Sequence, residues 1–306
     1  MFMMKIRAAI KNDESPKTKF FPSISAGLIL AMSLLMFSTL EAHAQSVAAA
    51  KKGKYFDRAI IVIFENTNYA AAMKGPFFKE LATSGANFSN FLAITHPSQG
   101  NYVALTSGAL NGVKGDGHYD LDVKNIADLL EAKGLTWKVY AENYPGKCFT
   151  GGSSGNYARK HNPFISYMDI QKNPARCANI VEAAEFDKDA AAGSLPDYVF
   201  FIPNLKNDGH DTGVAFADTW YRNKFSPYLK NSTFMNNTVV ISTFDESGGG
   251  SKNQIYTSIN GPAVNAKDYS DALGIFSLLQ LIEDNWNLGS FGKEDATSAK
   301  IPNIWK

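Results

Sequence analysis

Short apolar runs that end in acidic or amide residues restrict the fold of this chain more than any other feature. Buried strands are predicted at residues 59–64, 137–141, 198–202 and 238–244, with a weaker one at 255–259. Because these runs are mostly apolar and rich in β-branched residues, without a regular alternation of apolar and polar residues, they are typical of parallel strands covered on both faces.

Helical patterns lie between these strands. They are predicted at residues 77–83, 101–106, 126–133, 218–229 and 271–288. Strands that alternate with helices indicate an α/β fold, in which helices cover both faces of a mostly parallel sheet.

The polar residues at the strand ends indicate a ligand site. Glu65 and Asn66 follow the first strand, and Asp245 and Glu246 follow the strand at 238–244. The carboxyl ends of the strands are where ligands of open α/β sheets bind. Acidic groups brought together there repel one another unless a cation lies among them. Their oxygen ligands favour Mg²⁺, Ca²⁺ or Mn²⁺, and nearby histidines would shift the choice toward Zn²⁺ or Fe. The alternative is that these residues only cap the helices or turns that follow.

Ser98 is the candidate nucleophile. It stands between Pro97 and a helical run that starts near Asn101. A helix N-terminus favours a phosphate anion, and a metal-bound serine oxygen loses its proton more easily. Asn101 is a candidate substrate contact in the same segment. The alternative is that Ser98 only caps the helix.

Four histidines follow residue 44, and His210 is the strongest candidate among them for chemistry. It lies in residues 203–211 (PNLKNDGHD), where six polar residues follow a predicted strand. His210 could bind a metal, contact a phosphoryl oxygen or protonate a leaving group. Asp211 beside it is a candidate substrate contact, as are His96, His118 and His161; each of these three histidines could equally form only hydrogen bonds within its loop.

The N-terminus predicts export. Basic residues precede an apolar run at 20–40, and residues 42–44 read Ala-His-Ala, so residues 1–44 are interpreted as a signal peptide cleaved near Ala44. Residues 45–306 then form one domain in the periplasm or outside the cell. A retained membrane anchor is the alternative, since the run approaches the length of a spanning helix.

The charge balance gives no indication of a nucleic-acid partner. The first 44 residues hold five basic and three acidic residues, so the basic count falls from 30 to 25 and the acidic count from 29 to 26. A nucleic-acid surface normally shows a clear basic excess. Membrane contact is expected only through the signal sequence or a lipid substrate, and the sequence leaves the oligomeric state open.

Cys148 and Cys177 are expected to form a disulfide, because both lie in the exported part of the chain. Two buried free thiols are the alternative. A metal role is disfavoured because neither residue belongs to a Cys-x-x-Cys motif or a Cys/His cluster.

Six motifs, taken in order, resemble those of a bacterial phosphoesterase family that includes acid phosphatases and phospholipases C, within the alkaline-phosphatase-like superfamily. They are Glu65-Asn66 and residues 96–102 (HPSQGNY), 140–145 (YAENYP), 159–164 (RKHNPF), 203–211 and 244–249 (FDESGG). The resemblance covers most of residues 45–306.

The resemblance implies a three-layer α/β/α sandwich and a serine that coordinates a metal and forms a phosphoryl-enzyme. Carried over by motif position, Ser98 is the nucleophile, and His210 contacts phosphate or acts as an acid. The metal groups are Glu65, Asn66, Asp245 and Glu246. The resemblance also pairs Cys148 with Cys177.

Two departures from the family pattern stand out. Gly100 replaces a common proline. Many relatives also carry a histidine near Ile275, where this chain has none, which puts one phosphate or metal contact in doubt.

The expected function is that of a metal-dependent phosphomonoesterase acting on small phosphate esters. A phospholipase C or other phosphodiesterase is the alternative within enzymes. A non-catalytic protein that binds phosphorylated ligands is the alternative outside them.

Overall fold

The computed structural model describes residues 52–250 and 252–306, so the predicted signal peptide lies outside the described residues. An eight-stranded sheet has the order β11-β2-β10-β9-β1-β8-β4-β7. Its strands are β1 (Arg58–Phe64), β2 (Ala86–Phe88), β4 (Trp137–Ala141), β7 (Ile180–Glu182), β8 (Tyr198–Ile202), β9 (Thr238–Phe244), β10 (Thr257–Asn260) and β11 (Lys267–Tyr269). Every strand pair is parallel except the two that involve β10, so the prediction of a mostly parallel sheet is confirmed.

The central strands are buried because helices cover both faces of the sheet. All residues of β8 and β9 are buried, and so are all residues of β1 after Arg58. In the register of β1 and β9, Phe64 lies opposite Phe244. The residues that follow, Glu65 and Asp245, therefore leave the sheet at the same level.

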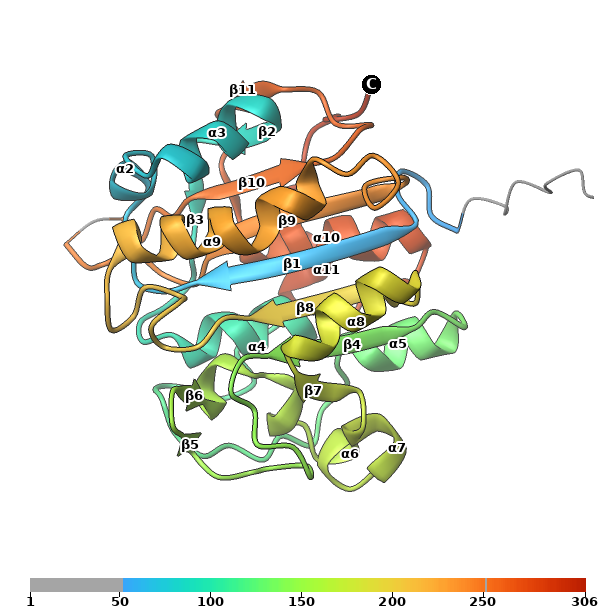
Figure 1. Cartoon of the computed structure of the whole chain (residues 1–306). Coiled ribbons are helices and arrows are strands. Elements are labelled where there is room, and N and C mark those ends of the chain that lie inside the picture. The colour runs from blue at the N-terminus through green and yellow to red at the C-terminus, as the bar shows by residue number, and fades with distance from the viewer. Residues whose placement is uncertain (1–51, 251) are drawn as a thin grey trace, which may run out of the picture. The chain divides into compact units, whose positions relative to one another are not determined.

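Helices form a layer on each side of the sheet. In Figure 1, α3 (Pro76–Ser84), α8 (Ala184–Ala192) and α9 (Val214–Leu229) lie in front of it, whereas α4 (Gln99–Ser107) and α10 (Ile275–Trp286) lie behind it. Aromatic rings join the front layer to the sheet: the ring of Phe64 lies 4.9 Å from that of Phe78 and 4.8 Å from that of Tyr221. The predicted three-layer α/β/α architecture is confirmed.

Smaller elements fill the connections. They are α2 (Tyr69–Ala72), β3 (Phe91–Leu92), α5 (Ile126–Ala132), β5 (Ser153–Ser154), β6 (Tyr157–Ala158), η2 (Arg159–His161), η3 (Phe164–Ser166), α6 (Met168–Gln171), α7 (Pro174–Cys177), β12 (Leu273–Gly274) and α11 (Glu294–Thr297). A disulfide joins Cys148, in the loop after β4, to Cys177 at the end of α7, with Cα atoms 5.6 Å apart. The predicted bridge is confirmed.

Two predicted elements differ in detail. The run at 255–259 was grouped with the parallel strands, but β10 is antiparallel to β9. The described residues between β9 and β10, 245–250 and 252–256, contain no helix to carry the chain back across the sheet, so the next strand runs in the opposite direction. The helix predicted from residue 271 begins at Ile275, because Leu273 and Gly274 pair with β3.

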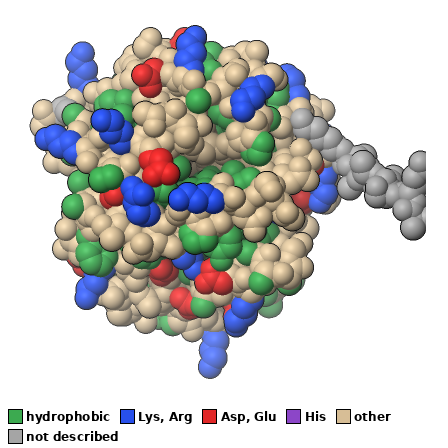
Figure 2. Space-filling view, turned by 45° about the horizontal axis from the view of Figure 1, so that its top comes forward, with side chains coloured by type: hydrophobic (Ala, Val, Ile, Leu, Met, Phe, Trp, Pro, Cys, Tyr) green, Lys and Arg blue, Asp and Glu red, His purple; other side chains and the backbone are tan. Residues whose placement is uncertain are grey.

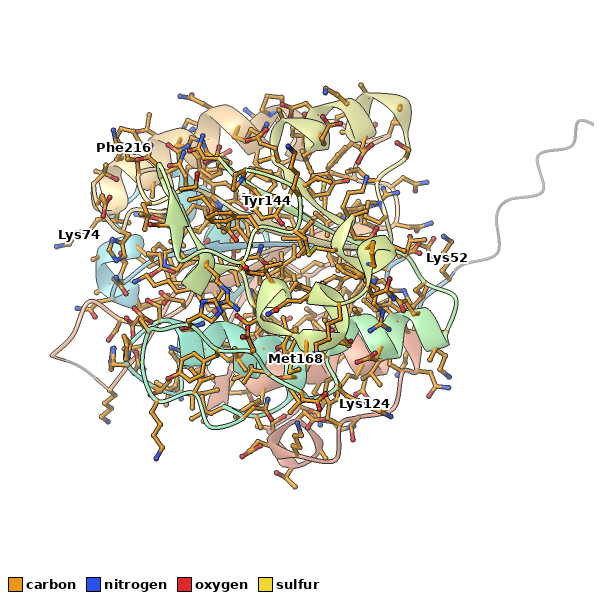
Figure 3. All side chains as sticks on the ribbon, turned by 90° about the horizontal axis from the view of Figure 1, so that it is seen from below. Lys52, Lys74, Lys124, Tyr144, Met168 and Phe216 are labelled. Carbon is orange, nitrogen blue, oxygen red and sulfur yellow. A yellow bond between two sulfur atoms is a disulfide. The ribbon has the colours of Figure 1, made fainter. Side chains whose placement is uncertain are left out.

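The surface carries charges of both signs. On the face shown in Figure 2, basic side chains lie among acidic ones, in line with the near-equal counts of 30 and 29 in the sequence. Phe216, near the start of α9, is a large hydrophobic residue that is 48% exposed, and Figure 3 shows it at the edge of the molecule. Within residues 52–250 and 252–306, no helix is both long and apolar enough to cross a membrane.

Candidate active site

Acidic side chains converge beyond the carboxyl ends of β1, β8 and β9. Glu65 follows β1, Asp245 follows β9, and Asp208 lies in the loop after β8. Backbone hydrogen bonds hold these segments together: Glu65 N donates to Asp208 O at 3.0 Å, and Asp245 N donates to Phe64 O at 2.9 Å. The sheet thus fixes the backbone positions of the three acidic residues, at the edge where a ligand site is expected.

Ser98 lies directly before α4, and its side chain faces the carboxylates. It occupies the N-cap position, yet its hydroxyl makes no capping hydrogen bond. Ser98 Oγ donates to Glu65 Oε2 at 2.9 Å and lies 3.3 Å from Glu246 Oε1. Capping of α4 therefore does not account for this serine, whereas a nucleophile activated by neighbouring carboxylates has this arrangement.

The site concentrates negative charge away from water. Glu65, Asp208, Asp245 and Glu246 are all buried. Burial, followed by repulsion from Glu246, raises the pKa of Asp245 to about 8, and burial raises the pKa of Asp208 to about 7. Burial, then Asp245 and Asp208, hold the pKa of Glu65 well above its usual range. Ionisation of these groups together requires compensating positive charge.

A divalent cation fits this charge and the available oxygens. Asp245 Oδ2 and Asn66 Oδ1 are buried without a hydrogen-bond partner. The backbone N–H of Asn66 donates to Asp245 Oδ1 at 3.1 Å, which keeps the two side chains adjacent. The predicted ligand set offers hard oxygen donors of the kind that Mg²⁺, Ca²⁺ and Mn²⁺ prefer. Its members, which stay predictions, are Glu65, Asn66, Ser98, Asp245 and Glu246.

His161 is buried between two carboxylates of the site, those of Glu65 and Asp208. Its Nε2 lies 3.2 Å from Glu65 Oε1, and its Nδ1 lies 3.2 Å from Asp208 Oδ2. Burial, then the charges of Lys160 and His210, lower the pKa of the His161 imidazole well below its usual range, so the ring is neutral. Potential ligand atoms of Glu65, His161 and Asp208 lie within 4.8 Å of one another, so these three could also hold a metal ion.

His210 lies next to His161 and contacts charged neighbours. The two rings are 5.9 Å apart. His210 Nδ1 lies 2.7 Å from Asp211 Oδ1, and its Nε2 lies 3.4 Å from Lys160 Nζ. A lysine ammonium can only donate, so this contact assigns the ring proton of neutral His210 to Nδ1, facing Asp211.

The other predicted substrate contacts are placed differently. His96 Nδ1 lies 2.6 Å from Glu246 Oε2, at the rim of the acidic cluster. Asn101 accepts hydrogen bonds from Ile94 N and Thr95 N at 2.9 and 3.1 Å, so it shapes the loop that carries His96. His118 is more than half exposed and lies 3.4 Å from Asp120. Substrate contact by any of these stays a prediction.

The position without the expected histidine is apolar. Ile275 is 3% exposed and lines a small cavity together with Tyr102 and Asp245. An apolar side chain therefore underlies the acidic cluster at this end of α10.

Several residues of the site escaped the sequence reasoning. The Tyr102 hydroxyl donates to Glu65 Oε1, and burial holds the pKa of this phenol well above its usual range. Asp208 stands in the same motif as His210, and Lys160 directly precedes His161, so their motifs carried a signal. Asp116, which lies 2.8 Å from Lys160, stands two residues before the candidate His118, so its segment also carried a signal.

A model of the Phosphoesterase family matches residues 43–289. The chain belongs to this family. The resemblance inferred from the motifs is thereby confirmed, and this phosphoesterase shares its fold with a protein of the alkaline phosphatase superfamily from Vibrio parahaemolyticus. That structure is 15% identical, with a TM-score of 0.57, and the match covers 80% of this chain and 71% of the other.

Three relatives bear on function. An acid phosphatase of Aspergillus fumigatus is 35% identical, over 90% of this chain and 63% of its own length. A probable acid phosphatase of Kluyveromyces lactis is 34% identical, over 84% of this chain and 66% of its own. This phosphoesterase thus spans just under two thirds of these two fungal proteins. A phosphatidylinositol-3-phosphatase of Mycobacterium tuberculosis is 32% identical, over 95% of this chain and 96% of its own length.

Proposed function

We propose that this phosphoesterase is an exported, metal-dependent phosphomonoesterase with Ser98 as its nucleophile. The observation that carries the proposal is the serine hydroxyl, which lies 2.9 Å from Glu65 and 3.3 Å from Glu246 within a buried acidic cluster. The relatives named as acid phosphatases and as a phosphatidylinositol phosphatase support a phosphate monoester as the substrate.

The chemistry follows from the groups around the serine. A divalent cation among the carboxylates would neutralise charge on the phosphoryl group. Ser98 Oγ attacks phosphorus in line while the bond to the leaving alcohol breaks, which gives phosphoserine. Glu65 Oε2, which accepts the serine hydrogen bond, takes the hydroxyl proton. Water then attacks the phosphoserine, phosphate leaves, and Glu65 returns the proton to Ser98.

His210 is the proposed acid for the leaving group. Asp211 orients its ring through Nδ1, which leaves Nε2 to carry the second proton once a substrate oxygen takes the Lys160 ammonium, 3.4 Å from Nε2, as its partner. That proton passes to the departing alkoxide, and the ring regains a proton from the attacking water in the second step. A histidine oriented by a carboxylate is suited to this exchange.

Export is supported by two features. The first is the charged, apolar and small-residue order of residues 1–44. The second is the Cys148–Cys177 disulfide, which an oxidising compartment maintains. N-terminal sequencing of the protein recovered from the periplasm or the culture medium tests the proposal. A start near Gln45 would support it, and recovery of full-length protein in membranes would contradict it.

Activity is tested with p-nitrophenyl phosphate after chelation, followed by the return of Mg²⁺, Ca²⁺, Mn²⁺ or Zn²⁺ one at a time. We expect at least one cation to restore phosphate release. Ser98→Ala should abolish turnover without changing the melting temperature, whereas Ser232→Ala, at an exposed serine, should behave like the wild type. Hydrolysis of bis-p-nitrophenyl phosphate in preference to the monoester would instead indicate a phosphodiesterase.

A further inference from the structure

A carboxylate occupies a position next to the proposed nucleophile, held by two donors of the site. Asp116 Oδ1 accepts a hydrogen bond from Gln99 N at 3.1 Å. Asp116 Oδ2 accepts one from Lys160 Nζ at 2.8 Å. Because Gln99 directly follows Ser98, this anionic group is bound one residue away from the serine that would attack phosphorus.

The donors around Asp116 are of the kind that bind an anion. The N–H of Gln99 opens α4, a nine-residue helix, and N–H groups at a helix N-terminus favour negative charge. Gln99 also turns its side chain toward this segment, because its Oε1 accepts a hydrogen bond from Gly117 N at 2.7 Å. Its Nε2 is buried without a partner, so it is a further donor that an oxygen could use.

Lys160 contacts other residues of the candidate active site as well as Asp116. Its ammonium lies 3.4 Å from His210 Nε2, and its charge interacts with those of Glu65 and Asp245. The lysine and Asp116 both remain partly accessible, with side chains 23% and 29% exposed. An incoming anion can therefore reach Lys160, and Asp116 has room to move toward solvent.

We propose that Lys160 and the Gln99 N–H bind two oxygens of the substrate's phosphoryl group, and that the Asp116 carboxylate occupies the position of these oxygens until the substrate displaces it. This inference rests on the proposed phosphatase function and names its substrate class. A monoester presents two negative charges and three free oxygens, whereas a diester presents one charge and two free oxygens. The charge of Lys160 therefore selects phosphate monoesters.

Replacement of Lys160 tests this selection. Lys160→Met should lower kcat/KM for p-nitrophenyl phosphate by about 100-fold, the usual loss for one donor to a transition-state oxygen. The loss for bis-p-nitrophenyl phosphate should be at least tenfold smaller, or about 10-fold at most. Lys160→Arg should keep the preference for the monoester. Lys124→Met, at an exposed lysine before α5, is the matched control and should change neither value. Equal losses on both esters would overturn the proposal.

Replacement of Asp116 tests whether its carboxylate competes with the substrate. Asp116→Asn keeps a hydrogen-bond acceptor for Gln99 but removes the charge, so it should lower KM for the monoester and tighten the binding of inorganic phosphate. A rise in KM for the monoester together with a rise in the dissociation constant for inorganic phosphate would overturn the competition. Asp116 would then be a positioning residue for Lys160.

Calorimetry separates this inference from the proposed function. Inorganic phosphate is titrated into the Ser98→Ala variant with added Mg²⁺, with and without Lys160→Met. We expect Lys160→Met to weaken binding at least about tenfold, a change equivalent to one lost charged contact. Unchanged phosphate affinity would refute the role of Lys160 even if the wild type is a phosphatase. A wild type that releases no phosphate from any ester would refute the proposed function instead.

Discussion

The buried acidic cluster should make the metal-free protein less stable as the pH rises. Removal of two of its carboxylates should remove most of this loss of stability. The perturbation is the double substitution Asp208→Asn and Asp245→Asn. Burial raises the folded-state pKa of these groups to about 7 and about 8, while in the unfolded chain they ionise near pH 4. Between these values the folded state binds more protons than the unfolded state, so stability falls with rising pH.

The size of the effect follows from proton counting. From pH 5 to pH 6.5, both carboxyls are ionised in the unfolded chain and still largely protonated in the folded one. Two protons over 1.5 pH units correspond to about 4 kcal/mol, since one proton contributes about 1.4 kcal/mol per pH unit. The double variant lacks this contribution. Its free energy of unfolding, relative to that of the wild type, should therefore rise by about 4 kcal/mol between pH 5 and pH 6.5, although the variant loses activity.

Urea unfolding in the presence of a chelator measures this difference. Neutral His161 contributes a slope of the opposite sign, but it is present in both proteins and largely cancels in the comparison. Added cation should stabilise only the wild type, and more strongly at higher pH, because ligands bind in their deprotonated form. If the free energies of unfolding of the two proteins changed with pH in parallel under chelation, this would refute the conclusion that the cluster holds negative charge without a compensating cation.

Three further predictions concern single contacts. Cys148→Ser with Cys177→Ser should lower the free energy of unfolding by about 3 to 4 kcal/mol, as expected for a bridge that spans 29 positions, measured by urea unfolding under non-reducing conditions. His210→Asn should lower kcat for an alkyl phosphate by about 100-fold and for p-nitrophenyl phosphate far less, because p-nitrophenolate leaves without a proton; equal losses would contradict the acid role. Tyr102→Phe removes the hydrogen bond to Glu65 and should lower kcat by about tenfold with KM little changed, whereas unchanged kinetics would leave this tyrosine with a packing role only.

The central fold was predictable because its signals are local. β1, β4, β8 and β9 were found to within one residue, since each is a mostly apolar run with an acidic or amide residue within two positions of its end. The short strands β2, β7 and β11 were missed because each has only three residues, too few for a hydrophobic pattern. α8 was missed as well: Phe186 is its one buried residue, so no apolar stripe marks the helix.

The site was predictable only where residues follow strands directly. Glu65 and Asp245 leave adjacent parallel strands, so the sheet itself brings them together. Asn101 shows the limit of reasoning from motifs, because its side chain is bonded to the backbone of Ile94 and Thr95. A polar residue next to a nucleophile can thus serve the loop, and sequence alone does not distinguish this from substrate contact.

Asp116 and Lys160 show why charge balance in a site has to be read from the folded chain. They are 44 positions apart, in segments that are not neighbouring strands, and their 2.8 Å contact depends on the paths of both loops. The acidic cluster calls for a cation, but an anionic substrate must also approach it. In the proposed site, the lysine and the first N–H of α4 would meet that second requirement beside Ser98. A site that paired Ser98 with carboxylates alone would repel an anionic substrate, whereas in the proposed role the charge of Lys160 would let this acidic cluster accept a phosphate dianion.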